Sequence, residues 1–400
     1  MDVMNVKSEQ PKNLFLSLIS YISFTFIGYF IIGLSLSVLP IFISKTLGFS
    51  MLVAGIVISL QYLTTFLMRA YSGKIVDQKG PKPAVIGSML SFTLTGVILM
   101  AAYYFRFSPA VSLVFLIITR LLTGCAEGMV GASPINWAIL VLGEQNTAKI
   151  ISYNGVASYG ALALGAFSGV IMVQDLTFYG LGILIICAGL AGYLMARNKQ
   201  NKIGVQSAEK RRSFWSVLAK VAPFGFCLAF GGLGFATIST FITLYYDYYH
   251  WKDGALCLSV FGILFVFSRI VFSNAINTFG GIKVAIASLA VETIGLTIIS
   301  LSHQSFMALI GAGITGLGFS LIFPALGVMA IKTVPPSNQG SALAGYGLFI
   351  DISLGITGPL IGSVADNFGL PYIFPFSVGI VLIGLALAYY LKIKDSGPEL

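Results

Sequence analysis

Charged side chains are scarce in this sequence. Only 9% of its 400 residues are Asp, Glu, Lys or Arg, whereas 57% are hydrophobic, and the mean hydropathy is +0.92. Soluble domains carry about 25% charged residues, and a soluble core of this size cannot absorb so much apolar surface. The composition excludes an ordinary soluble domain and predicts an integral membrane protein surrounded by a lipid bilayer.

Several functional motifs are also missing. The two histidines stand alone, and the four cysteines fall within apolar stretches, so we expect neither a metal site nor disulfides. The sequence has no phosphate-binding loop of the Gly-x-x-x-x-Gly-Lys-Ser/Thr type and no Ser/His/Asp set. Alternation with a period of two, as in an outer-membrane barrel, is absent. These absences argue against an enzyme and against transport driven by ATP hydrolysis.

Long apolar runs are what the sequence does contain. A spanning helix needs about 20 predominantly apolar residues, and twelve stretches qualify. We therefore predict an all-α membrane protein with twelve transmembrane helices. They lie at about 15–43, 51–73, 84–105, 111–142, 151–173, 177–197, 214–246, 254–276, 284–302, 306–333, 339–364 and 371–392.

The basic residues predict the orientation of these spans. If the N-terminus lies inside, nearly all of the 23 Lys and Arg residues fall in inner loops. Lys45, Arg106 and Lys252 would lie outside, and Arg120 within a span. Positive charge on the cytoplasmic side is the usual orienting bias. We expect a multi-pass protein of a bacterial inner membrane with both termini cytoplasmic, and no nucleic-acid partner.

The chain divides into two similar halves. A polar segment, 196–213, separates six spans from six, which predicts bundles at 1–197 and 214–400 joined by a linker at 198–213. Arg69 precedes Gly80 by the same spacing as Arg269 precedes Gly280. Further on, Gly165 in "LGAFSGV" matches Gly358 in "TGPLIGS". Two six-helix halves are typical of transporters that bind their substrate between the repeats.

The stretch "RAYSGKIVDQKGPK" (69–82) gathers five charged residues between two apolar runs. A solvated loop is the simplest interpretation. Orientation alone does not explain its acid, Asp77, and we hypothesise that Asp77 meets the inner end of a helix from the other half and pairs with Arg69. This would form a cytoplasmic gate from Arg69, Gly73, Asp77, Gly80, Lys82 and Arg269, with Gly73 permitting tight packing and Gly80 the turn.

These residues carry a resemblance to a known family. Gly73, Asp77, Gly80 and Lys82 match the signature of the loop between helices two and three of the major facilitator superfamily. Arg120 and Gly124 match its motif in helix four, and "LGITGPLIG" (354–362) matches its glycine-proline pattern in helix eleven. The sequence resembles this family over its whole length, nearest to small bacterial proton-coupled efflux proteins for drugs or sugars such as arabinose. The resemblance implies the major facilitator fold. The first span lacks the acid found in many such exporters, so a proton site must lie elsewhere.

Four ionisable residues fall well inside predicted spans: Arg120, Glu127, Glu292 and Asp351. Such residues are costly in a bilayer and mark a pathway by default. Arg120 and Glu127, seven apart, share one helix face. Glu127 and Asp351 are the proton-coupling candidates, and Arg120 could hold an anionic group or pair with Asp351. Glu292 lies on a peripheral helix and is more simply a structural group.

Polar side chains in other spans are weaker candidates for the substrate cavity. Single polar residues in spans are often contacts between helices, which is the alternative interpretation for each of them. The candidates are Tyr29, Gln61, Asn154, Tyr159, Asn274 and Tyr346.

Together these patterns predict a secondary transporter rather than an enzyme. We expect a monomeric, proton-coupled exporter of a small organic solute that works by alternating access and needs no cofactor besides the proton gradient. One alternative is a proton symporter that imports a sugar or an organic anion. An alternative of another class is a membrane receptor or scaffold that transports nothing.

Overall fold

The computed structural model describes residues 14–203, 214–272, 274–335 and 339–395. Within these ranges the chain is helical, with turns and short loops but no strand, as predicted. The first half forms α1 (Leu14–Leu36), α2 (Leu39–Ile41), α3 (Met51–Lys79), α4 (Pro81–Tyr104), α5 (Pro109–Val130), α6 (Ser133–Leu142) and α7 (Thr147–Arg197). The second half forms α8 (Phe214–Tyr248), α9 (Gly254–Val271), α10 (Ala275–Phe279), α11 (Gly281–Ser300), α12 (Ser305–Lys332), α13 (Gln339–Phe368) and α14 (Ile373–Asp395).

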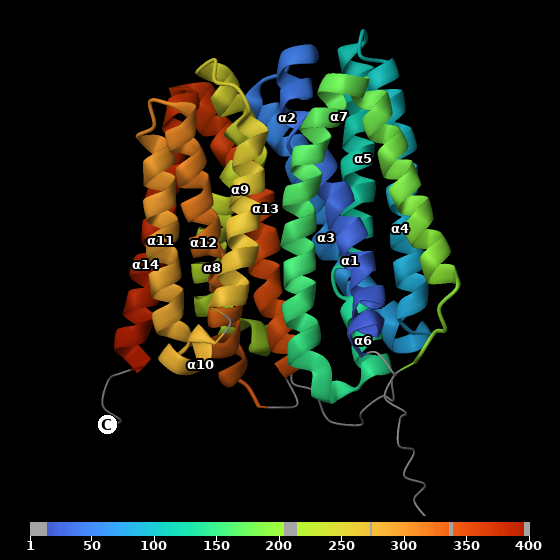
Figure 1. Cartoon of the computed structure of the whole chain (residues 1–400), viewed down its shortest axis with the longest axis vertical. Coiled ribbons are helices and arrows are strands. Elements are labelled where there is room, and N and C mark those ends of the chain that lie inside the picture. Colours follow the sequence, from blue (N-terminus) through green and yellow to red (C-terminus); the bar gives the residue numbers. More distant parts are fainter. Residues whose placement is uncertain (1–13, 204–213, 273, 336–338, 396–400) are drawn as a thin grey trace, which may run out of the picture.

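Eleven helical stretches in the described ranges are long and apolar enough to span a bilayer. The difference from the predicted twelve lies in α7, whose 51 residues form one stretch. At about 1.5 Å per residue α7 would be about 75 Å long, more than twice the bilayer's hydrocarbon thickness of about 30 Å. Its helical geometry breaks at Thr177 (φ 61°, ψ −176°), where we expected the sixth span to begin. Figure 1 shows α7 turning back at the upper end of the molecule.

Glycine and proline define the sharp turn between α3 and α4. Gly80 is the C-cap of α3 and has a φ of 81°, which residues with a Cβ rarely adopt. Pro81 lies in the first turn of α4, where its fixed φ suits a helix start. Gly280 ends α10 with a φ of 87°, and α11 follows at once. The predicted equivalence of Gly80 and Gly280 is confirmed for the backbone.

The span predicted over 111–142 is divided into two helices. α5 ends at Val130, and α6 begins at Ser133 with Pro134 in its first turn. A proline has no N–H to continue the helical hydrogen bonds and its ring clashes with the preceding turn. The helix that began at Pro109 is therefore interrupted here, and α6 starts separately at Ser133.

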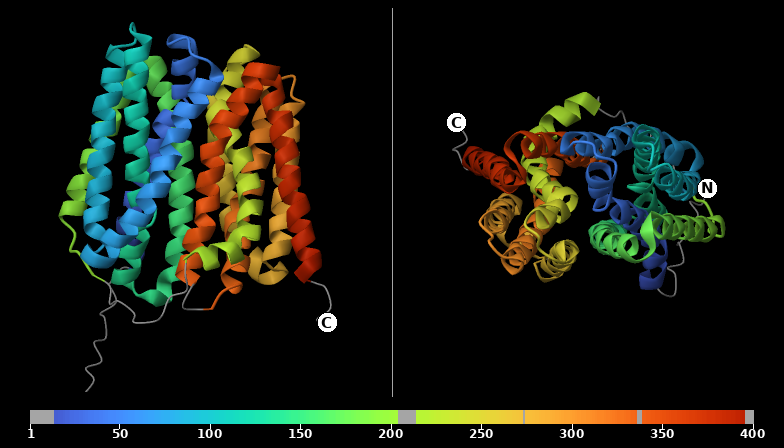
Figure 2. Two further views of the ribbon diagram at one scale, coloured as in Figure 1. Left: turned by 180° about the vertical axis from the view of Figure 1, so that it is seen from behind. Right: turned by 90° about the horizontal axis from the view of Figure 1, so that it is seen from above.

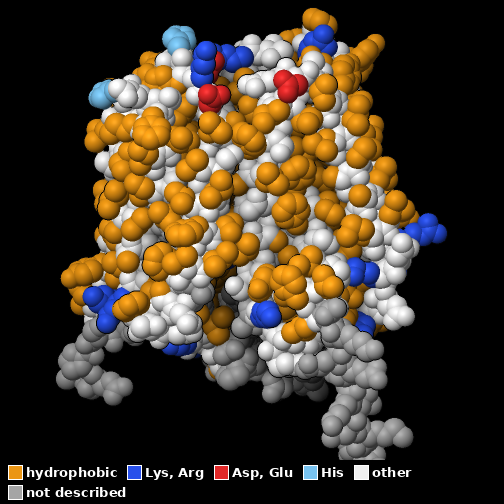
Figure 3. All heavy atoms as spheres, in the orientation of Figure 1, with side chains coloured by type: hydrophobic (Ala, Val, Ile, Leu, Met, Phe, Trp, Pro, Cys, Tyr) orange, Lys and Arg blue, Asp and Glu red, His pale blue; other side chains and the backbone are white. Residues whose placement is uncertain are grey.

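The helices form two bundles that lie side by side, α1–α7 in one and α8–α14 in the other (Figures 1 and 2). The α3–α4 turn lies at the lower end of Figure 1 and α2 at the upper end. Hydrophobic side chains cover most of the surface between the two ends on the face in Figure 3, whereas most charged side chains gather near the ends. This distribution fits a protein that spans a bilayer.

The two bundles contact each other at their upper ends. The Asp366 carboxylate, near the end of α13, accepts hydrogen bonds from the backbone N–H groups of Met51 and Leu52 at 3.0 and 2.9 Å. These groups form the N-terminus of α3, whose dipole favours a negative charge. Lys45 and Asp247 add an ion pair of 2.7 Å between the halves.

Glycines permit the close approach of α3 to α13. A Cβ added to Gly55 or Gly358 would overlap backbone atoms of the other residue, and small residues allow such contacts between membrane helices. Gly165, the predicted counterpart of Gly358, instead lies against the backbone of Phe30 in α1. The sequence match between these two glycines therefore does not correspond to equivalent contacts.

Candidate functional site

A chain of polar side chains links α1, α3 and α5 inside the first bundle. The Arg120 guanidinium donates to Gln61 Oε1 at 3.0 Å and to Ser35 Oγ at 2.9 Å. Gln61 Nε2 in turn donates to Glu127 Oε2 at 2.9 Å, and Thr65 Oγ1 donates to the same oxygen at 3.0 Å. Arg120 and Glu127 are both buried. They share a helix face as predicted, and Gln61 bridges them.

Two glycines of α5 bring α3 close enough for these bonds. A Cβ at Gly124 would overlap the carbonyl of Gln61, and one at Gly128 would lie 2.8 Å from the carbonyl of Thr65. Both positions are therefore restricted to glycine unless the helices separate. The helix that packs along these two glycines is α3.

The second polar contact crosses between the bundles. Arg69 Nη2 of α3 lies 2.8 Å from Asp351 Oδ1 of α13. The Asp351 side chain is only 3% exposed, and that of Arg69 is 29% exposed. Arg120 was a predicted partner of Asp351, but its guanidinium is hydrogen-bonded to Gln61 and Ser35. Arg69 fills that role because it lies two turns beyond Tyr62 on the face of α3 that meets α13.

Two tyrosines extend this contact into the first bundle. Tyr29 of α1 lies near Arg69, since a Cβ on Gly131 would be 3.8 Å from Tyr29 Oη and 3.9 Å from Arg69 Nη2. Tyr62 of α3 lies against Gly355 of α13, one turn beyond Asp351. Tyr62 was missed in the sequence, although its spacing of seven from Arg69 places both on one side of α3. The candidate site thus joins the two acids proposed for proton coupling, with Arg69 between them.

A third arginine lies across the interface between the halves. Arg269, in the last turn of α9, donates through Nη2 to the carbonyl of Ser320 at 2.8 Å, and its guanidinium lies over the Phe265 ring at 5.3 Å. Tyr159 of α7 packs against the same ring, with 4.5 Å between centroids. Tyr346, also predicted for the cavity, is buried and donates to the carbonyl of Phe323 at 3.0 Å.

The two predicted asparagines lie elsewhere. Asn154 is buried and accepts a hydrogen bond from Thr25 at 2.7 Å, which joins α7 to α1 within one bundle. Asn274 is exposed between α9 and α10 and not inside a span, because α9 ends at Val271 rather than at the predicted residue 276.

The structure describes the predicted gate residues only in part. Arg69 is paired with Asp351, whereas the side chain of Asp77, and with it the predicted Asp77–Arg69 pair, lies outside the described part of the structure. Among the described residues, a Cβ at Gly73 would meet nothing within 4 Å, so the expected tight packing at this glycine is not found there. Lys82 Nζ donates to the carbonyls of Arg197 and Lys199 at 2.8 and 2.7 Å.

The beginning of the predicted linker is therefore bound to the first bundle. Asn201 donates to the carbonyl of Lys79 at 2.6 Å and accepts from the backbone N–H of Lys82 at 3.2 Å. Trp137 Nε1 donates to the carbonyl of Gln200 at 3.1 Å. Lys199 lies 4.0 Å from the centre of the Tyr21 ring. Partial burial lowers the pKa of the Lys199 ammonium. The turn at Gly80 thus positions the beginning of the linker as well as α4.

Glu292 of α11 is fully buried, and neither carboxylate oxygen has a hydrogen-bond partner among the described residues. Its oxygens face Gly231 and Gly234 of α8, within the second bundle. This location agrees with its predicted place away from the interface between the halves. Among the described residues, no group of three or more His, Cys, Asp or Glu could hold a metal ion.

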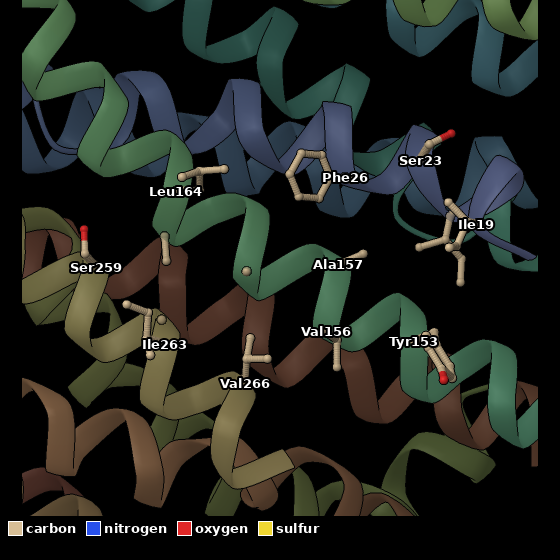
Figure 4. A pocket seen from close by; sticks show the side chains of 14 residues that line it. Ile19, Ser23, Phe26, Tyr153, Val156, Ala157, Leu164, Ser259, Ile263 and Val266 are labelled. Carbon is tan, nitrogen blue, oxygen red and sulfur yellow. The ribbon is translucent and has the colours of Figure 1, made fainter. Parts of the chain in front are cut away.

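A groove of about 780 Å³ opens between α1, α7 and α9. Figure 4 shows apolar side chains such as Phe26, Leu164 and Ile263 projecting into it, with Ser23 and Ser259 among the few polar ones. None of the arginines or acids described above lines it. The groove is thus separate from the polar contacts between the halves.

Comparisons with known proteins agree with this fold and arrangement. The family model of the Major Facilitator Superfamily matches residues 21–276 and 253–399. An uncharacterized MFS-type transporter of Pseudomonas aeruginosa is 46% identical over 387 residues, which are 97% of this chain and 96% of that protein. A similar protein of Burkholderia pseudomallei is 45% identical over 384 residues, covering 95% and 94% of the two chains. The solved structure of a mutant of the nucleoside transporter NupG aligns with a TM-score of 0.75 over 94% of this chain and 99% of that one, at 15% identity.

The fold and the charged interface between two helical bundles define a secondary transporter of the membrane. The chain belongs to the major facilitator superfamily. Members of this family move solutes and are not enzymes, which confirms that part of the prediction. The likeness to NupG concerns the fold alone.

Proposed function

We propose that the protein is a proton-coupled exporter of a small organic solute, an antiporter that works by alternating access of its two bundles. The observation that supports this most directly is the buried ion pair between Arg69 and Asp351, 2.8 Å long, from opposite halves. A pair that bridges two moving bodies must break when they separate. A proton on the Asp351 carboxylate removes its charge and thereby weakens the bridge.

Glu127 provides the second acid of this mechanism. It interacts electrostatically with Arg69 from inside the first bundle, while Asp351 holds Arg69 from the second. When Asp351 takes up a proton, the Arg69 guanidinium is released toward Glu127. The two halves then lose a contact that stabilises one conformation, and a change in protonation becomes a change in shape.

The contacts at the upper ends support a particular conformation and orientation. Asp366 and the Lys45–Asp247 pair hold these ends together. We propose twelve spans, with α7 contributing two on either side of Thr177, and both termini at the lower, cytoplasmic face of a bacterial inner membrane. The structure then represents a state that is closed to the outside. Function as a monomer, with no cofactor besides the proton gradient, is part of the same proposal.

Transport by reconstituted protein tests the proton coupling. Proteoliposomes carrying a pH-sensitive dye inside would be challenged with individual solutes, and proton movement that depends on the solute would be recorded. We expect Asp351→Asn and Glu127→Gln to abolish this movement. Asp175→Asn is the matched control, since Asp175 is exposed near the upper end, between the two arms of α7. Unchanged coupled transport in both interior variants would exclude the mechanism.

The alternatives differ in observable ways. A proton symporter importing a sugar or an organic anion would use the same acids, so the direction of proton movement that accompanies solute entry distinguishes it from an exporter. A receptor or scaffold would show binding without counterflow of labelled solute. The buried arginines favour an anion over a neutral sugar within the symporter alternative.

A further inference from the structure

Two arginines cross the interface between the halves in opposite directions. Arg69 of α3 reaches α13 in the second bundle, where its Nη1 would lie 3.6 Å from a Cβ on Gly347. Arg269 of α9 reaches α7 in the first bundle, where its Nη1 occupies the space that a Cβ on Gly155 would need. Each guanidinium therefore fits against a glycine of the other half.

Neighbouring contacts show that this reciprocity is a property of the repeat. Tyr62, which lies seven residues before Arg69 on the same side of α3, lies against Gly355 of α13. Gly262, at the same spacing from Arg269, lies against Ala163 of α7. Residues on the helix that carries the arginine recur 200 positions later in the second half, and residues on the helix that carries the glycine recur 192 positions later. The two interfaces therefore pair their residues in the same register.

The register identifies the counterpart of Asp351. The residue that stands 192 positions before it is Tyr159. Tyr159 packs on Phe265, over which Arg269 also lies. The α3–α13 interface thus places the Asp351 carboxylate beside Arg69, whereas the α7–α9 interface places the neutral phenol of Tyr159 near Arg269.

Arg269 consequently lacks the acid that its equivalent has. Among the described residues, no Asp or Glu forms an ion pair with it. Its Nη2 is bonded to the carbonyl of Ser320, and its Nε is buried without a hydrogen-bond partner. Arg269 is itself only 9% exposed. A guanidinium in this position presents donors arranged for a carboxylate or phosphate, but the described residues supply no such group.

We propose that Arg269 and Tyr159 form the recognition site for the anionic group of the substrate, and that this substrate is a small organic carboxylate. The carboxylate would take the place that Asp351 occupies at the equivalent interface. One guanidinium and one phenol match a single negative charge better than a phosphate dianion. The assignment rests on the proposed transport function and specifies its substrate class.

Equilibrium binding to the purified full-length protein in detergent tests this assignment. The probes are matched solutes, namely glucose, glucuronate and glucose 6-phosphate, together with benzamide and benzoate, each titrated while the melting temperature is followed. We expect at least one carboxylate to stabilise the protein where its neutral partner does not. Arg269→Gln should weaken that binding by about ten- to a hundredfold, as for loss of hydrogen bonds to a charged group.

Further variants separate recognition from folding. Gly155→Ala keeps every charge but displaces the Arg269 guanidinium, and should also weaken carboxylate binding by about tenfold or more. Tyr159→Phe removes one hydroxyl and should weaken it by a few fold. Arg106→Gln is the control, because Arg106 lies over the Tyr103 and Phe107 rings away from this interface, and its binding should be unchanged.

The outcomes distinguish this inference from the proposed function. The carboxylate assignment would be overturned if only the neutral solutes, only glucose 6-phosphate or none of the probes stabilised the protein. It would also be overturned if carboxylate binding were unchanged in both Arg269→Gln and Gly155→Ala. Carboxylate binding that is sensitive to Arg269, together with unchanged proton coupling in Asp351→Asn and Glu127→Gln, would sustain the recognition site while refuting the coupling mechanism.

Discussion

Replacing Asp351 by Asn should destabilise the protein far more than replacing Asp247 by Asn. The two acids form ion pairs of nearly equal length, 2.8 Å to Arg69 and 2.7 Å to Lys45. Their surroundings differ, since the Asp351 side chain is 3% exposed and the Asp247 side chain 54%. The comparison therefore isolates the effect of burial on an ion pair.

The expected magnitude follows from that difference. Removing one partner of a buried pair costs about 3–5 kcal/mol, because the other charge is left unpaired. Arg69 is 29% exposed, so water solvates part of its remaining charge, and Asn retains a weaker acceptor. We expect a loss of about 2–3 kcal/mol for Asp351→Asn. An exposed pair contributes about 0–1 kcal/mol, which is the limit for Asp247→Asn.

Thermal unfolding in detergent micelles measures this effect without knowledge of the substrate. A loss of 1 kcal/mol lowers the melting temperature by about 2–4 °C for chains of about 150–250 residues, and by roughly half of that for a chain of this length. Asp351→Asn should therefore melt about 2–6 °C lower, and Asp247→Asn within about 2 °C of the parent.

A double variant provides the strictest check. Arg69→Gln with Asp351→Asn leaves no unpaired charge, so it should be more stable than the sum of the two single losses predicts. Additive losses, or equal shifts for Asp351→Asn and Asp247→Asn, would show that the pair does not stabilise this conformation and would refute the reasoning.

Two further predictions concern packing and the linker. Gly124→Leu should prevent accumulation of folded protein, because the leucine side chain would collide with the carbonyl of Gln61. Gly73→Leu should be tolerated, because a Cβ there meets no described atom within 4 Å. Size-exclusion profiles in detergent would compare the two variants, and equal profiles would contradict the α3–α5 contact. Lys82→Met should speed cleavage by trypsin after Lys199 and Lys202, because it removes the bonds to the carbonyls of Arg197 and Lys199. Lys79→Met is the control, since only the backbone of Lys79 binds Asn201, and equal cleavage rates in both variants would refute an anchoring role for Lys82.

Local features of this fold could be predicted from the sequence. Apolar runs defined the spans, and Gly80 and Pro81 defined the turn that follows α3. The spacing of Arg120 and Glu127 indicated one helix face, because helical periodicity depends only on neighbouring residues. Each of these inferences requires a single segment of chain.

Contacts between segments could not be predicted in the same way. Arg69 was placed where the second span meets its inner loop, yet α3 continues to Lys79 and carries Arg69 within reach of Asp351, 282 residues away. Asn274 was placed in a span because the residues around it are apolar, but asparagine also favours helix N-caps, and it precedes α10 in that position. Which helices meet, and in which register, depends on packing that periodicity does not report.

The difference between Asp351 and Tyr159, which occupy equivalent positions in the two interfaces, explains how the proposed mechanism can couple proton binding to substrate binding. If both arginines had carboxylates, the two interfaces would respond alike to protons, and no charge would remain for a solute. With one acid and one phenol, the α3–α13 interface responds to a proton and the α7–α9 interface to an anion. Because both interfaces join the same two bundles, one rocking motion alters both. Each ligand then biases the same conformational equilibrium through its own arginine, which is the physical requirement for linkage between two binding events.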